Sequence, residues 1–125
     1  MLIKYRTIGI IETPLNESAA ADKTTSNESL IVLDPPLAKG LKGLKPGQRI
    51  QIVFHFHRAD GFELCQHPQG DRLRPKRGVF ALRSPRRPNP IGLSEVDLVE
   101  IKENVLYVKG LDAIDGTPVL DIKPA

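Results

Sequence analysis

The densest group of chemically capable side chains in this sequence is a run of seven cations, without one acid, between residues 72 and 87. Its members are Arg72, Arg74, Lys76, Arg77, Arg83, Arg86 and Arg87. Six are arginines, whose planar guanidinium fork suits carboxylate and phosphate groups. Prolines within the run stiffen the backbone, which lowers the entropy cost of presenting the cations. The run indicates either an anion-binding site or a solvated basic face.

Two histidines, His55 and His57, share one face of an alternating segment whose other face is phenylalanine. They suit metal ligation, base chemistry or a surface position. A metal would need further ligands, and the nearby pair Cys65 and His67 does not have a zinc-site spacing. We therefore expect no metal site. Surface histidines, or a ligand contact at the end of the segment, are the remaining interpretations.

Three aspartates, Asp112, Asp115 and Asp121, lie close together in the sequence. They suit a cation or a positively charged substrate, but Asp115-Gly116 is also a tight-turn sequence, and aspartates cap their own backbone. Both interpretations stay open. Phosphate-binding glycine loops are absent, and no Ser/His/Asp or Cys/His arrangement indicates a nucleophile. The residues alone assign no catalytic group.

The elements that would position these groups are short strands. Residues 49–57 alternate cleanly between apolar and polar and form the best-defined strand. Other segments of strand composition are residues 4–12, 30–33, 93–101, 105–109 and 119–122. A helical turn is expected over residues 37–44, and residues 83–90 hold three prolines, which exclude a helix or a central strand. The pattern predicts a mainly β fold, a small antiparallel sandwich or barrel-like domain of about six or seven short strands with little helix.

Length and composition limit the classes of protein to which this sequence can belong. The 125 residues are 40% hydrophobic and 26% charged, which is typical of one globular domain spanning residues 1–125. A single cysteine excludes an internal disulfide, and no apolar run is long enough for a spanning helix. Residues 1–6 lack the layout of a signal peptide, so we expect a cytoplasmic protein with no membrane partner. A net charge of +3 is too small by itself to imply nucleic acid.

Two longer motifs are distinctive strings. Residues 78–94 read GVFALRSPRRPNPIGLS, and residues 111–124 read LDAIDGTPVLDIKP. With IGIIETP at 8–14 and FHFH at 54–57, in the same order, the sequence resembles the TsaA/TrmO-like (YaeB-like) family over nearly its whole length.

The resemblance implies a function. Members of that family are S-adenosylmethionine-dependent methyltransferases that act on N6 of threonylcarbamoyladenosine next to the tRNA anticodon. They have a compact, mainly β barrel-like fold and work as homodimers. The implied cofactor is therefore S-adenosylmethionine, and the implied partners are tRNA and a second copy of the chain. The alternatives are a non-catalytic S-adenosylmethionine- or nucleic-acid-binding module and a methyltransferase that acts on a small molecule.

The resemblance also implies site residues. The cofactor-binding residues would be His57, Arg58, Arg83, Leu93, Asp112, Ala113, Ile114 and Asp115. Cations of the basic run would contact tRNA phosphates: Arg72, Arg74, Lys76, Arg77, Arg86 and Arg87.

The chemistry of these residues agrees with the resemblance. An arginine can bind the cofactor's carboxylate, aspartates can face its sulfonium, and an apolar side chain can hold its adenine. The chain departs from the family in one element. Members carry a Pro-Arg-Gln element in the first long loop that contributes to the cofactor site, whereas this loop reads SAAADKTTSN at residues 18–27. The chain also stops soon after the final motif.

Overall fold

A computed structural model of the chain describes residues 1–13 and 28–125. The strands of this part are β1 (Gly9–Glu12), β2 (Glu28–Leu33), β3 (Arg49–His55), β4 (Cys65–Gln66), β5 (Arg77–Gly78), β6 (Ile91–Lys102), β7 (Val105–Lys109) and β8 (Pro118–Pro124). Three short 3-10 helices accompany them: η2 (Pro35–Leu41), η3 (Pro68–Gly70) and η4 (Val79–Ala81). Among the described residues, no helix is long and apolar enough to cross a membrane.

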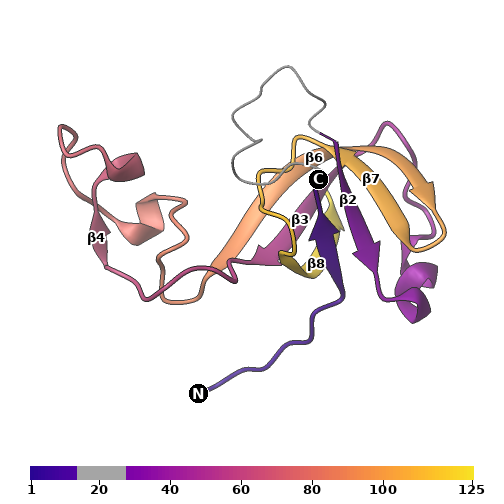
Figure 1. Cartoon of the computed structure of the whole chain (residues 1–125), viewed down its shortest axis with the longest axis horizontal. Helices are drawn as coiled ribbons and strands as arrows, with labels where there is room; N and C mark the ends of the chain where they lie inside the picture. Colours follow the sequence, from indigo (N-terminus) through magenta and orange to yellow (C-terminus); the bar gives the residue numbers. More distant parts are fainter. Residues whose placement is uncertain (14–27) are drawn as a thin grey trace.

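Six of these strands form a closed barrel in the order β1-β2-β7-β6-β3-β8, and every pairing is antiparallel (Figure 1). The expected mainly β, barrel-like fold is therefore confirmed. The longest strand, β6, pairs with both β3 and β7, and the β6–β7 hairpin turns at Glu103, which has a φ of 54°. The strands form because β-branched residues alternate with polar ones, so one face of each strand can turn inward.

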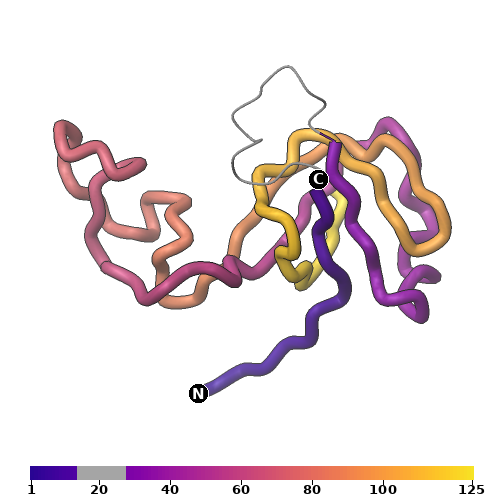
Figure 2. The backbone as a smooth tube through the Cα atoms, in the orientation of Figure 1, coloured from indigo at the N-terminus to yellow at the C-terminus, as the bar shows by residue number. Residues whose placement is uncertain are grey.

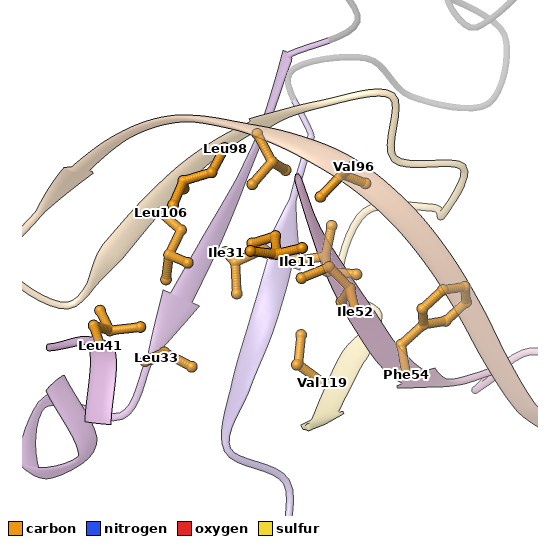
Figure 3. Close-up of a cluster of buried hydrophobic side chains, with 12 residues drawn as sticks. Ile11, Ile31, Leu33, Leu41, Ile52, Phe54, Val96, Leu98, Leu106 and Val119 are labelled. Carbon is orange, nitrogen blue, oxygen red and sulfur yellow. The ribbon is translucent and has the colours of Figure 1, made fainter. Parts of the chain in front are cut away.

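The interior of the barrel is filled by the inward-facing aliphatic side chains of all six strands and by Leu41 of η2 (Figure 3). In β3 the buried residues are Ile50, Ile52 and Phe54, as the alternation predicts. The rings of Phe54 and Phe56 pack edge to face, with centroids 5.3 Å apart. This core makes the barrel a rigid support for the loops at its ends.

Two strand ends differ from the sequence prediction. The strand expected at residues 4–12 begins at Gly9, although Ile8 already donates to Val119 O and accepts the Asp34 N–H. Residues 1–7 form no strand, and β8 beyond Val119 pairs with β3 alone. In β3, pairing stops at His55, because Phe56 still donates its N–H to Pro90 O at 2.8 Å but Pro90 has no N–H to return the bond. His57 therefore lies just beyond the strand.

Residues 56–90 form an arm that leaves the barrel between β3 and β6 (Figures 1 and 2). The arm contains the two-stranded ribbon β4–β5 with η3 and η4. Its small core is Val79, which is 1% exposed and whose N–H donates to Leu64 O at 2.8 Å. The whole basic run from residue 72 to 87 lies on this arm. The structure thus separates a packed barrel from a basic extension.

Candidate functional site

The first part of the candidate site is where the end of β3 meets the Asp115-Gly116 turn. A Cβ built on Gly116 would lie 4.0 Å from Nε2 of His57, so the two residues are close neighbours. Gly116 has a φ of 83°, a left-handed conformation that favours glycine. The sequence-predicted cofactor residues His57 and Asp115 are therefore brought to the same end of the barrel.

The turn is held in place by hydrogen bonds to β1, to the residue that follows β1, and within the turn itself. The N–H of Gly116 donates to Ile11 O at 2.8 Å, and the buried hydroxyl of Thr117 donates to Ile114 O at 2.6 Å. The carboxylate of Asp115 accepts the Thr13 N–H at 3.0 Å. One oxygen of Asp115 therefore holds the chain at the point where the first long loop begins. The loop itself, with the departure from the Pro-Arg-Gln element, lies outside the described residues.

The second part of the site is on the outer surface of β6. Arg83 Nη1 donates to Leu93 O at 3.2 Å, and this contact ties the basic motif to the barrel wall. Leu93 faces outward, with 44% of its surface exposed, and it pairs with Val53 of β3. Both parts of the site thus depend on β3, which carries Val53 and ends shortly before His57.

Two phenylalanine rings of β3 and its end pack against the backbone of β6 at Gly92, between the two parts. Gly92 pairs with Phe54, and a Cβ on Gly92 would overlap the Phe54 ring and lie 2.8 Å from Cζ of Phe56. Only glycine leaves room for these two rings. Packing thereby explains why the motif at 78–94 has glycine at position 92.

Most of the predicted cofactor residues are exposed in the described part of the chain. His57, Arg58, Arg83, Asp112 and Asp115 are exposed. Ala113 and Ile114 are half-buried. A cleft of about 790 Å³ lies elsewhere, between η2 and the β6–β7 hairpin, and none of the predicted site residues lines it.

The structure divides the basic run into two groups. Arg83, Arg86 and Arg87 make contacts within the chain. Arg87 Nη1 donates to the carbonyls of Leu82 and Ser84 at 3.0 and 3.1 Å, and Arg86 pairs with Glu63 at 3.4 Å. The other four cations are exposed and make no side-chain hydrogen bond or ion pair in the described part of the chain. These are Arg72, Arg74, Lys76 and Arg77.

One residue of the arm has a role that sequence reasoning missed. Gln66 Nε2 donates to Glu63 O at 2.7 Å and to Arg86 O at 2.6 Å, and so connects the ribbon to the proline-rich motif. A glutamine in a polar, irregular stretch carries no sequence signal for such a bridge. No group of three or more His, Cys, Asp or Glu side chains that could hold a metal ion occurs among residues 1–13 and 28–125.

The sequence matches one known protein family. Residues 11–125 match the family model of the tRNA-methyltransferase O N-terminal domain. The chain belongs to this family. The TsaA/TrmO-like resemblance expected from the motifs is thereby confirmed.

Three relatives define the relation more closely. A "probable S-adenosyl-L-methionine-binding protein" of Pyrococcus abyssi is 42% identical over 99% of this chain and 68% of its own length. A mouse tRNA (adenine(37)-N6)-methyltransferase is 45% identical over 67% of this chain and 20% of its own length. The crystal structure of TrmO from Pseudomonas aeruginosa superimposes with a TM-score of 0.76 at 32% identity, over 100% of this chain and 56% of that one. The chain thus spans little more than half the length of that TrmO.

Proposed function

We propose that this chain binds S-adenosylmethionine and transfers its methyl group to N6 of threonylcarbamoyladenosine beside the tRNA anticodon. The observation that carries the proposal is the family match over residues 11–125. The name of the mouse relative supports N6 of a tRNA adenine as the acceptor. The family's tRNA methyltransferases also support an enzyme over a binding module.

The side chains of the candidate cofactor site suit the charges of that cofactor. Arg83 gives one N–H to Leu93 O and makes no other hydrogen bond in the described part of the chain, so the rest of its fork can bind a carboxylate. Asp112 and the second oxygen of Asp115 are exposed toward solvent and can face a positive sulfonium. Leu93 offers an exposed apolar surface to an adenine ring.

Methyl transfer to nitrogen requires mainly that the protein position the cofactor and the acceptor base. S-adenosylmethionine supplies an electrophilic methyl group when it is bound. Transfer to nitrogen needs an in-line approach and exclusion of water, and it needs no covalent bond to the protein. The protein's task is therefore to hold Arg83, Asp115 and the acceptor base in register. The rigid β3–β6 pair and the pinned turn at Gly116 suit that task.

The arm is the proposed tRNA contact. Its four unpaired cations, Arg72, Arg74, Lys76 and Arg77, suit phosphates without base specificity. Arg86 and Arg87 lie beside them, but their guanidinium groups also hold the arm together. We assign these two a supporting role first and a phosphate contact second. The proposal includes a cytoplasmic location, which a tRNA substrate supports.

The active form is proposed to be a homodimer. Several large apolar side chains of the arm are exposed in the described part of the chain. Phe62, Leu64, Leu73 and Phe80 have exposed fractions of 51%, 61%, 95% and 78%. A second copy that covers part of this surface would also shield the open cofactor site from water.

Calorimetry tests the cofactor site directly. S-adenosylmethionine and S-adenosylhomocysteine are titrated into the wild type, Arg83→Ala and the matched arm variant Arg72→Ala. Micromolar binding by the wild type and Arg72→Ala, with loss in Arg83→Ala, is expected. Transfer of a labelled methyl group is then measured on tRNA with and without threonylcarbamoyladenosine.

Each outcome selects one function. Labelling only of tRNA that carries the modified base supports the proposal. Cofactor binding without transfer to either tRNA would favour a small-molecule methyltransferase. A wild type that binds tRNA but neither cofactor form would favour a nucleic-acid-binding module, which the altered loop at residues 18–27 makes a serious alternative.

A further inference from the structure

Leu73 is the most exposed of the large apolar side chains of the arm. Its exposed fraction is 95%, and it lies in the segment between β4 and β5, which projects away from the barrel (Figure 1). A single exposed leucine is common on protein surfaces and by itself indicates no function. The backbone that holds Leu73 and the charges beside it are what distinguish this one.

The backbone around Leu73 is fixed by hydrogen bonds. A turn ends at Arg74, whose N–H donates to Asp71 O at 3.1 Å, and the Leu73 N–H donates to Oδ1 of Asp71 at 2.9 Å. Nδ1 of His67 donates to Arg74 O at 2.8 Å, because a carbonyl oxygen can only accept. Pro68, which is buried, anchors the start of the same segment. Little backbone entropy therefore remains to be lost when a ligand contacts Leu73.

Free cations flank Leu73 on both sides. Its neighbours in the chain are Arg72 and Arg74, which are exposed, and their guanidinium groups make no hydrogen bond or ion pair with the other described residues. The nearest acid, Asp71, accepts the Leu73 N–H with one carboxylate oxygen. The turn therefore presents one apolar side chain between two positive charges.

The other large exposed apolar side chains of the arm lie in different surroundings. Phe62 and Leu64 flank the acid Glu63, and Phe80 lies between two apolar residues. None of these three has a cation as its neighbour in the chain. Charge complementarity therefore assigns Leu73, and not the other three, to a polyanion that also offers an apolar face.

Unpaired RNA is a polyanion of this kind. It combines phosphates with exposed base faces, whereas the base faces of an RNA duplex are stacked inside the helix. A base that receives a methyl group from a protein-bound cofactor must leave the stack, so its neighbours in the loop lose a stacking partner. An apolar side chain such as leucine can cover the face that is left.

We propose that Leu73 packs on the face of an unstacked base in the anticodon loop, while Arg72 and Arg74 bind the phosphates to either side. This inference rests on the tRNA methyltransferase function proposed above, and it names the contact by which the arm distinguishes a loop from a duplex. A second copy of the chain is the less suitable occupant. A protein surface that covered Leu73 would also take two unpaired guanidinium groups out of water and would have to supply carboxylates for both.

Two RNA probes test the contact: an anticodon stem-loop that carries threonylcarbamoyladenosine, and a fully paired RNA duplex of the same length. Their affinities are measured by filter binding at several salt concentrations, with S-adenosylhomocysteine present. The wild type is expected to prefer the stem-loop. Leu73→Ala should bind the stem-loop about five- to tenfold more weakly, with an unchanged salt slope, and should bind the duplex like the wild type. Arg72→Gln should instead lower the salt slope for both probes by about 1.

A larger side chain and a matched leucine provide the controls. Leu73→Phe should bind the stem-loop at least as tightly as the wild type, because an aromatic ring stacks well on a base. A protein pocket shaped for leucine would reject the larger ring. Leu37→Ala removes a leucine of η2 that is 43% exposed, and it should change neither affinity. Circular dichroism checks that each variant keeps the fold.

Other results would overturn the inference. A wild type without preference for the stem-loop, or unchanged stem-loop binding by Leu73→Ala, would remove the base contact. Normal RNA binding by Leu73→Ala with weaker dimerisation in sedimentation would assign the leucine to a second copy. Methyl transfer to tRNA by the wild type, measured separately, judges the proposed enzyme. Transfer together with an unchanged stem-loop preference in Leu73→Ala would reject the contact alone.

Discussion

At the scale of single residues, Gly92 decides how closely β3 and β6 can approach. Its missing side chain leaves space for the rings of Phe54 and Phe56, the latter at 2.8 Å from a built Cβ. We predict that Gly92→Ala lowers the free energy of unfolding by about 1–3 kcal/mol, because the added methyl group must displace a buried ring. Urea denaturation measures the change.

The matched control for this prediction is Gly40→Ala in η2. No atom lies within 4 Å of a Cβ built there, so this variant should be neutral or slightly stabilising. Equal stability of the two variants would show that the rings move aside easily. In that case the motif's glycine would need an explanation outside packing.

At the scale of elements, the arm is held by polar bridges more than by a core. Arg87 binds two carbonyls and Gln66 two more, and together they shape the segment that carries Arg83. We predict that Arg87→Gln weakens S-adenosylmethionine binding about three- to tenfold, since each charged hydrogen bond contributes roughly 1.5–3 kcal/mol and part is regained by relaxation. Calorimetry checks this.

Arg72→Gln provides the comparison on the same arm. It should leave cofactor affinity unchanged and weaken tRNA binding instead, because the Arg72 side chain makes no hydrogen bond or ion pair in the described part of the chain. If both variants lost tRNA binding alone, Arg87 would be a phosphate contact and not a support of the cofactor site.

At the scale of the whole molecule, charge is concentrated on the arm while the cofactor residues lie where the arm joins the barrel. We predict that exchanging Arg72, Arg74, Lys76 and Arg77 for Gln lowers the slope of log affinity for tRNA against log salt by about 3. Cofactor affinity should not change. The slope is measured by filter binding between low and physiological salt.

A matched set of barrel cations tests the location of that effect. Lys39, Lys42, Lys45 and Lys102 are exposed on or near η2 and the β6–β7 hairpin, away from the arm. Their exchange for Gln removes the same net charge. An equal loss of slope would mean that net charge, and not the arm, governs tRNA binding.

Much of the fold was predictable from local pattern. The alternation of Ile50, Ile52 and Phe54 predicts the buried face of β3, and residues 93–101 and 105–109 predict the β6–β7 hairpin. The strand expected at 4–12 was too long, because composition shows strand propensity but not how far a neighbouring strand runs alongside, and the pairing of β1 with β8 extends only to Val119. The two-residue strands β4 and β5 carry too little pattern to be seen.

The sequence by itself determined the barrel's inward face and the family, because these depend on local periodicity and on contiguous motifs, and it supplied the residues of the proposed cofactor site. Only the tertiary structure decided the closure of the barrel and the meeting of His57 with Gly116. It also divided the arginines of the basic run into those that hold the arm and those whose side chains make no hydrogen bond or ion pair in the described part of the chain. These properties depend on contacts between residues far apart in the chain, which no local pattern records.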